Sequence, residues 1–253
     1  MPAWVAQSRA YLERWIDEEG VDPAQITRII DGLAASAGRE PSQLAGPQRP
    51  EVLIPGLTAT PWWDRDLFPW VRELEGAFGD IRTEFEAVGG LAATAAVRHP
   101  NSANLAERGQ WNAYYFHLLG KSYPEHIAEC PRTVKTIAAL DGITEAGMCY
   151  FSIMGPRTHV APHCGFINAR VRCHLALVVP DGGHMRVGSE SRAWVEGKAL
   201  LFDDSFEHEV WNDSPSGRVV LLFDVWHPDL TAVEKRALAH MMTAWKTFLY
   251  KDN

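Results

Sequence analysis

The sequence predicts a mainly β fold, a sandwich or barrel, with flanking helices. From Gln110 onward, short segments rich in β-branched and aromatic residues alternate with stretches that contain Gly, Pro, Asp and Asn, which is typical of an all-β sandwich or barrel. Helical periodicity is found mainly before that point and at the C-terminus. The 253 residues, 46% hydrophobic and 22% charged, suffice for one large domain or a domain with a small helical cap.

Two amphipathic helices are predicted in residues 1–48, which form an N-terminal helical segment. The first carries an apolar stripe at helical spacing. The second opens at Asp22 as its N-cap, with Pro23 at the first helical position. A linker rich in proline, glycine and polar residues, REPSQLAGPQRP, follows. Residues 68–88 again repeat apolar side chains every three and four positions, so a further helix is expected there.

The strands are expected to form one domain over residues 49–235, with a helix at 125–140 between the first two of them. A C-terminal helix over residues 236–253 is expected to pack on the same domain. Thr231 and Glu234 are three residues apart, as in a capping box, and open this helical region.

Composition and charge narrow the classes of partner. With 24 Lys and Arg against 32 Asp and Glu, the net charge is −8, which argues against a nucleic-acid partner. No apolar run approaches the roughly 20 residues needed to span a bilayer, and the first residues do not resemble an export signal, so no membrane partner and a cytoplasmic location are expected. The four cysteines lack CxxC spacing and are expected to be buried thiols. The N-terminal helices must bury a face against the barrel or a second subunit, which leaves a homodimer open.

Strand alternation sorts the polar residues of the β region. In FEHEVW, His208 shares a face with apolar residues while both glutamates point away, so His208 is expected to lie inside. In ARVRCHLALVV, Arg170, Arg172 and His174 share one face. This strand is either an outer strand with an exposed polar face or the lining of a polar pocket.

Arg218 begins RVVLLFDVW, a strand that is apolar on both faces, so its charge needs a partner. That partner is either a carboxylate such as Asp224 or Glu209, or an anionic ligand. His163 lies in GPRTHVAPHCGF, 45 residues before His208. Two distant histidines followed by a buried arginine suit a non-haem iron oxygenase, in which imidazoles hold Fe(II) and the arginine pairs with 2-oxoglutarate. A buried histidine is more often a core residue, so the spacing by itself leaves the function open.

Residues 150–230 resemble the aspartyl/asparaginyl β-hydroxylase family of Fe(II)/2-oxoglutarate-dependent oxygenases. The matching runs are YFSIMGPRTHVAPHCG, NARVRCHLALVVP, EGKALLFDDSFEHEVWN and RVVLLFDVWHPDL, and IPGLTATPWWD and QWNAYYF extend the resemblance to roughly residues 50–235. The resemblance implies a double-stranded β-helix core of the jelly-roll, cupin-like type. It also implies a hydroxylase that uses Fe(II), 2-oxoglutarate and O2 and releases succinate and CO2.

By this resemblance, His163 and His208 match the two iron ligands. Arg218 matches the arginine that pairs with the C5 carboxylate of 2-oxoglutarate, and Ser152 matches the hydroxyl beside it. These four residues are therefore expected to lie around one pocket. His159 is expected to be structural, because its neighbour His163 fills the ligand role.

The resemblance also concerns the substrate end of the pocket. Arg172 and His174 match residues near the C1 carboxylate of 2-oxoglutarate and the substrate. Gly165 stands where most oxygenases of this class have an acidic ligand; the family lacks that acid too, and water is expected to complete the coordination. Ala113 stands where animal members have a glutamine that contacts the hydroxylated side chain.

The change at Ala113 favours a small-molecule substrate, amino-acid-like and hydroxylated at an unactivated carbon, with the β-carbon as the expected target. Three alternatives stay open at this point. The chain could be a peptidyl Asp/Asn β-hydroxylase, a halogenase with chloride beside Gly165, or a non-catalytic barrel that senses a small acid or a metal.

Overall fold

The computed structural model describes residues 3–38, 44, 46–93 and 95–249. Most of the β structure follows Gln110, as the sequence predicts. The strands are β1 (Trp62–Trp63), β2 (Val97–Arg98), β3 (Ala106–Arg108), β4 (Trp111–Leu118), β5 (Lys121–Ser122), β6 (Met148–Met154), β7 (Thr158–His163), β8 (Arg170–Val178), β9 (Gly183–Val187), β10 (Glu190–Ala193), β11 (Ala199–Phe202), β12 (His208–Asn212) and β13 (Arg218–Trp226).

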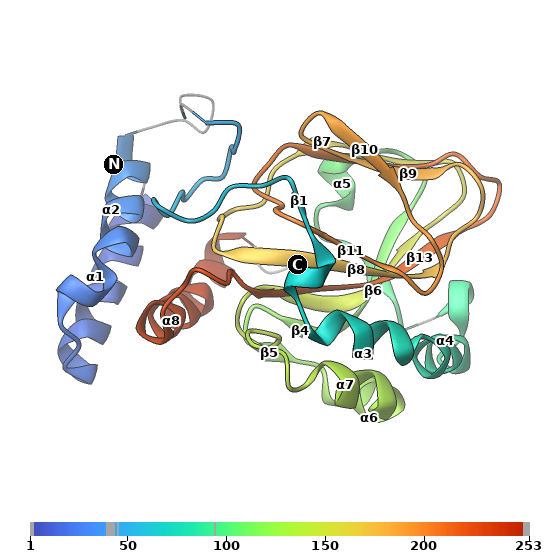
Figure 1. Cartoon of the computed structure of the whole chain (residues 1–253), viewed down its shortest axis with the longest axis horizontal. Helices are drawn as coiled ribbons and strands as arrows, with labels where there is room; N and C mark the ends of the chain where they lie inside the picture. The colour runs from blue at the N-terminus through green and yellow to red at the C-terminus, as the bar shows by residue number, and fades with distance from the viewer. Residues whose placement is uncertain (1–2, 39–43, 45, 94, 250–253) are drawn as a thin grey trace.

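Two antiparallel sheets face each other and form the core (Figure 1). The larger sheet has the order β1-β11-β8-β13-β6-β4-β2, with β5 paired to β4, and the smaller has the order β10-β9-β12-β7-β3. From β6 to β13 the chain alternates between the sheets, with β6, β8, β11 and β13 in the larger one and β7, β9, β10 and β12 in the smaller. This winding makes the core a double-stranded β-helix, a jelly roll, so the predicted fold class is confirmed.

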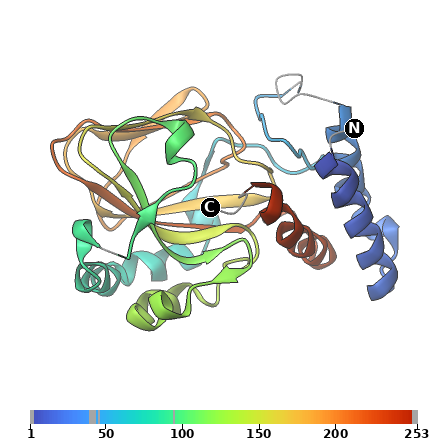
Figure 2. The ribbon, with the colours of Figure 1, turned by 180° about the vertical axis from the view of Figure 1, so that it is seen from behind.

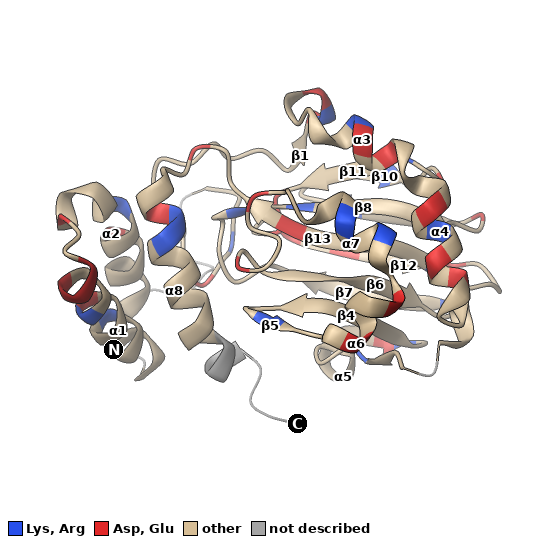
Figure 3. Cartoon of the chain, turned by 90° about the horizontal axis from the view of Figure 1, so that it is seen from below, with Lys and Arg blue, Asp and Glu red and all other residues tan. Residues whose placement is uncertain are grey.

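Four helices cover the outer face of the larger sheet (Figure 3). They are α3 (Trp70–Gly76), α4 (Phe78–Ala87), α6 (Pro124–Glu129) and α7 (Pro131–Ile137). Each of the two predicted helical stretches is thus a pair of short helices. The predicted helix over 125–140 is interrupted because Pro131 has no backbone N–H to continue the hydrogen-bond ladder, and Cys130 before it leaves the helical region with φ −124° and ψ 56°.

The N-terminal segment forms α1 (Ala3–Glu19) and α2 (Thr27–Ala35), which lie beside α8 (Ala232–Leu249) on one side of the barrel (Figure 2). The side chain of Asp22 accepts a hydrogen bond from the backbone N–H of Ala24 at 2.9 Å, so it caps the turn before α2 as predicted. Trp245 of α8 donates its indole N–H to Ser8 of α1 at 2.7 Å. Within the linker 39–50, residues 39–43 and 45 lie outside the described residues.

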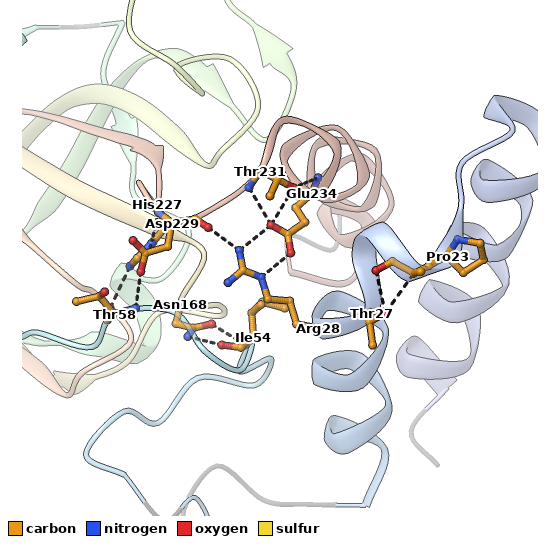
Figure 4. A network of polar contacts seen from close by, with 11 residues as sticks. Pro23, Thr27, Arg28, Ile54, Thr58, Asn168, His227, Asp229, Thr231 and Glu234 are labelled. Atoms are coloured by element: carbon orange, nitrogen blue, oxygen red, sulfur yellow. Dashed lines mark hydrogen bonds and ion pairs between the residues drawn. The ribbon is translucent and has the colours of Figure 1, made fainter.

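The start of α8 is joined to the N-terminal helices through one carboxylate (Figure 4). Glu234 accepts the backbone N–H of Thr231 at 2.8 Å, and its own N–H is donated to the Thr231 hydroxyl at 3.3 Å, which is the predicted capping box. The same carboxylate accepts two hydrogen bonds from the guanidinium of Arg28 on α2, one of them at 2.7 Å. The division into 1–48, 49–235 and 236–253 stays a prediction.

The remaining composition-based expectations concern the cysteines and membrane spans. All four cysteines are free thiols; three are buried and Cys164 is half-buried. Among the helices of the described residues, none has both the length and the apolar character required to cross a bilayer.

Candidate functional site

A cavity of about 680 Å³ opens between the two sheets. Its walls are the inward-facing side chains of β6, β8 and β13 from the larger sheet and of β7 and β12 from the smaller one. The structure brings together in this lining every site residue that the sequence indicated: Ser152, His163, Arg172, His174, His208 and Arg218.

His163 and His208 face each other across two neighbouring strands of the smaller sheet. His163 ends β7 and His208 begins β12, and the two residues are partners in the strand register. Their ring centroids are 4.1 Å apart, with an interplanar angle of 52°. His208 is 3% exposed, as strand alternation predicted, because the acids on either side of it point to the other face.

Each of these imidazoles has its tautomer set by a backbone carbonyl. Nδ1 of His163 lies 2.8 Å from the carbonyl oxygen of Ala161, and Nδ1 of His208 lies 3.0 Å from that of Phe206. A carbonyl only accepts, so Nδ1 carries the proton and the Nε2 lone pair is free in both rings. Burial lowers the pKa of both histidines, which keeps them neutral. Two neutral Nε2 donors with oriented Nδ1 atoms fit a first-row divalent metal such as Fe(II).

Gly165 follows the first of these histidines by two residues and carries no ligand. Its backbone N–H donates to the carbonyl oxygen of Asp204 at 2.6 Å, and a Cβ built on it would lie 2.3 Å from Asp204 Oδ2. Its φ is not in the left-handed region, so the lack of space, not the backbone conformation, requires glycine here. In the described residues no group of three or more His, Cys, Asp or Glu side chains could hold a metal, and His163 and His208 are the two candidate ligands.

Beside the two histidines lies a buried network of two arginines and two aspartates. Arg172 donates to Asp224 through Nε at 2.8 Å and Nη2 at 3.0 Å, and its Nη1 lies 3.0 Å from Asp204. Arg170 donates to Asp204 at 2.8 Å. Burial opposes the charges of Arg170 and Asp204, but their mutual attraction outweighs it, so the pKa of the arginine is raised and that of the aspartate is lowered.

This network decides between the two interpretations of strand β8. Arg170, Arg172 and His174 are each less than 10% exposed and line the cavity, so their face belongs to a polar pocket and not to an outer strand. Asp204 and Asp224 both accept hydrogen bonds from the arginines of β8.

Arg218 is buried at 2% exposure, and in the part of the chain that the structure describes no carboxylate pairs with it. Its guanidinium carbon lies 4.4 Å from the ring centroid of Trp194. Its Nη1 makes only long contacts to Ser152, at 3.4 Å to the hydroxyl and 3.5 Å to the carbonyl, and its Nε has no hydrogen-bond partner in the described residues. Burial lowers the pKa of this arginine to about 9.

The salt-bridge alternative for Arg218 is therefore wrong. Asp224 pairs with Arg172, and Glu209 lies on the opposite face, where it accepts from His159 at 2.8 Å. His159 is thus a structural residue, as expected. A buried guanidinium without a counter-charge is unfavourable, and a ligand carboxylate at this place would pair with it. The geometry fits the distal carboxylate of 2-oxoglutarate.

His174 lies deeper in the same cavity, between Trp194 and Phe202. Neither of its ring nitrogens has a hydrogen-bond partner in the described residues. Burial, followed by the positive charge of Arg218, lowers its pKa well below the ordinary value. It therefore offers a neutral imidazole to a bound molecule.

Sequence reasoning did not single out His99, which is 1% exposed and also lines the site. It lies in a loop, where no strand alternation indicates which way its side chain points. Ala113, by contrast, is buried on β4 directly opposite Ser152, but it does not line the cavity wall.

The chain is similar to known proteins over most of the barrel. Residues 75–228 match the family model for aspartyl/asparaginyl β-hydroxylase. An aspartyl/asparaginyl β-hydroxylase of Mus musculus is 40% identical over 200 residues, which cover 76% of this chain and 26% of that protein. The aspartate β-hydroxylase domain-containing protein 2 of Rattus norvegicus is 35% identical over 219 residues, 83% of this chain and 64% of its own length.

A third relative, the aspartate β-hydroxylase domain-containing protein 1 of Homo sapiens, is 35% identical and aligns with 91% of this chain and 60% of its own length. Among solved structures, that of a Pseudomonas putida prolyl-4-hydroxylase aligns with 59% of this chain and 87% of its own, at 15% identity and a TM-score of 0.39. The chain thus spans between about a quarter and just under two thirds of the curated relatives it matches.

Proposed function

Because the chain belongs to the aspartyl/asparaginyl β-hydroxylase family, we propose that it is an Fe(II)/2-oxoglutarate-dependent hydroxylase. The observation that carries the proposal is Arg218, a buried guanidinium with no carboxylate beside it in the described residues. It lies in the same cavity as two imidazoles with free Nε2 lone pairs. A metal and a dicarboxylate together would use both features, whereas either ligand alone would use only one.

Each residue has a proposed task. His163 and His208 would hold Fe(II) through Nε2, with their ring orientations fixed by the carbonyls that accept from Nδ1. Arg218 would bind the distal carboxylate of 2-oxoglutarate through charge-assisted hydrogen bonds, with the Ser152 hydroxyl beside it. The bound iron, with 2-oxoglutarate and O2, supplies the oxidation of a C–H bond to an alcohol, and 2-oxoglutarate leaves as succinate and CO2.

Arg172 and His174 are proposed to border the other end of 2-oxoglutarate and the substrate. The guanidinium of Arg172 is held by two aspartates, so it contributes a fixed positive charge. His174 contributes neutral nitrogens to the same wall. Three apolar side chains of the same lining, Phe202, Met185 and Leu222, would exclude water and strengthen these interactions.

For the substrate, the relatives favour the peptidyl alternative over the free amino acid that Ala113 suggested. Their names refer to aspartyl and asparaginyl residues and to β-hydroxylation. We therefore propose that the chain hydroxylates the β-carbon of an Asp or Asn residue in a polypeptide.

An end-point assay tests this function. The protein with Fe(II) and 2-oxoglutarate is given peptides that contain one Asp or Asn, or free aspartate or asparagine, and succinate and product mass are measured. Peptide-dependent succinate and a peptide heavier by one oxygen are expected. Turnover only with the free amino acids would restore the small-molecule alternative, and the absence of any turnover would favour a sensor barrel.

A further inference from the structure

We propose that His99 is a substrate-binding residue whose Nε2–H donates a hydrogen bond to the side-chain oxygen of the residue to be hydroxylated. The inference rests on the proposed function and deepens it, because it assigns a group that selects for an oxygen-bearing side chain. His99 is 1% exposed and lines the cavity that holds His163 and His208.

The plane of the His99 ring is fixed by its neighbours. The backbone N–H of His99 donates to the carbonyl of Trp111 at 2.9 Å, one residue beyond the pairing of β2 with β4. The imidazole stacks on the Trp111 indole, with centroids 3.7 Å apart and an interplanar angle of 8°. The indole is held in turn, because its N–H donates to the Ser152 hydroxyl at 3.1 Å. The ring is therefore preorganised before any ligand binds.

The protonation of the ring follows from its other contacts. The backbone N–H of Asn101 donates to Nδ1 of His99 at 3.2 Å, so Nδ1 is an acceptor and the proton of the neutral ring is on Nε2. Burial, and then the charges of Arg172 and His163, lower the pKa of His99 to about 3. At neutral pH the ring thus presents one N–H donor without a charge.

This donor has no protein acceptor. Nε2 of His99 is buried without a hydrogen-bond partner in the described residues, whereas almost all buried donors in native proteins are paired. A ligand oxygen in the cavity would pair it. His99 lines the same cavity as His163 and Arg172, so a molecule bound there can reach it.

The chemistry of the donor predicts the selectivity. A neutral N–H can donate to an amide oxygen or to a carboxylate oxygen, so both Asn and Asp side chains can pair with it. An apolar side chain would bind less tightly, because it leaves the buried N–H donor unpaired. His99 would thus separate Asp and Asn from an isosteric apolar residue such as Leu, and would separate Asp from Asn only weakly.

Two variants isolate the hydrogen bond. His99→Phe keeps an aromatic ring that can stack on Trp111 but removes the N–H. His99→Gln loses the ring but keeps an N–H donor at similar reach. The ligands are blocked tripeptides with Asp, Asn or Leu in the middle, and binding is measured by calorimetry to protein loaded with Mn(II) in place of Fe(II) and with 2-oxoglutarate.

We expect the wild-type protein to bind the Asp and Asn peptides about tenfold more tightly than the Leu peptide, the size of one buried hydrogen bond. His99→Phe should abolish this difference while the affinity for 2-oxoglutarate is unchanged, and His99→Gln should restore much of it. Equal peptide affinities for wild type and His99→Phe would overturn the inference. A wild-type protein that binds none of the peptides, or that binds all three equally, would overturn it as well. A His99→Phe loss confined to 2-oxoglutarate would overturn it too, because the donor would then serve the cosubstrate.

Failure of the proposed function is visible separately in the same experiment. Wild-type protein that binds no 2-oxoglutarate in the presence of Mn(II) contradicts the oxygenase itself. Normal Mn(II)-dependent binding of 2-oxoglutarate, with no effect of residue 99 on the peptides, contradicts only the role of His99.

Discussion

The carboxylate of Asp204 lies in the space into which a side chain of residue 165 would project, so that a Cβ on Gly165 would come within 2.3 Å of Asp204 Oδ2. The carboxylate is held there by Arg170 and Arg172. The acidic ligand common to this class of oxygenase is thus absent at position 165, and a different acid, bound to arginines, fills the adjoining space.

Gly165→Ala is expected to destabilise the protein by about 1–3 kcal/mol, because the buried carboxylate of Asp204 cannot withdraw without losing its arginine partners. Gly165→Asp should be worse and should lower activity, since it adds a second carboxylate at the same place. Urea denaturation measures the change.

Gly79→Ala is the matched control: Gly79 lies in α4 with nothing within 4 Å of a Cβ, so that variant should be neutral or slightly stabilising. Equal stabilities of the two alanine variants would contradict the steric argument.

The product formed in chloride- or bromide-containing buffer is expected to gain oxygen and no halogen. A halide beside Gly165 would have to approach the carboxylate of Asp204, whose pKa is lowered by Arg170 and Arg172 so that it stays ionised. Mass spectrometry of the product distinguishes the two outcomes. A halogenated product from the unmodified protein would show that the chain is a halogenase.

Arg218→Met is expected to weaken 2-oxoglutarate binding strongly while leaving the free energy of unfolding of the ligand-free protein unchanged or higher. The variant removes a buried charge without a carboxylate partner. Arg172→Met is the control, since it removes the two-point partner of Asp224 and one of the two arginines that bind Asp204, and it should cost about 3–5 kcal/mol. Calorimetry with 2-oxoglutarate and urea denaturation measure both effects. If Arg218→Met is as destabilising as Arg172→Met, then Arg218 has a structural partner after all.

His208→Ala is expected to abolish turnover and to weaken Fe(II) binding severely with the fold intact, because one of two proposed ligands is lost. His159→Ala should retain the metal affinity, since that ring hydrogen-bonds Glu107 and Glu209 and does not line the cavity. Anaerobic titration with Fe(II) provides the comparison. Metal binding by His208→Ala at wild-type affinity would exclude His208 as a ligand.

The stability of the protein is expected to depend on pH through Asp203. Burial raises the pKa of this carboxyl from its ordinary value of 3.8 to about 7, so between these values the folded protein holds a proton that the unfolded chain has released. The contribution of Asp203 is therefore complete below the unfolded pKa and is lost as the pH rises through the folded one.

Asp203→Asn removes this titration, so the stability of the wild type relative to the variant should fall between about pH 4 and about pH 7, the unfolded and folded pKa values of the carboxyl. Urea denaturation of both proteins across that range measures the difference. Parallel stability profiles would mean that the carboxyl is ionised in the folded state.

The sequence predicted what local periodicity determines. The two-residue repeat of the strand predicted that His208 points inward. The strand that begins at Arg218 is apolar on both faces, which predicted that the charge of Arg218 lies inside. Pro131 was visible in the sequence as an interruption of a helix, although one continuous helix was expected over that range.

Contacts that depend on strand register could not be predicted in this way. Asp204 follows β11 in a turn, and only the pairing of β11 and β13 with β8 brings it and Asp224 to Arg172. His99 is directed into the cavity by a loop that folds onto Trp111, and no periodic pattern marks such a loop. A homodimer stays open, and the cytoplasmic location stays a prediction.

The hydrogen bond from Trp245 to Ser8 gives the N-terminal helices a structural connection to the cavity. Trp245 packs edge-on against Phe166 at 5.0 Å, and Trp4 of α1 contacts the same ring at 5.4 Å. Phe166 is the residue next to Gly165, three positions beyond His163, so the loop that follows His163 packs against α1 and α8 from outside the barrel. Amino-acid changes on α1 lie far from any reacting atom, yet they can alter the rigidity of this loop. Through the loop, evolution or protein engineering could adjust the turnover rate.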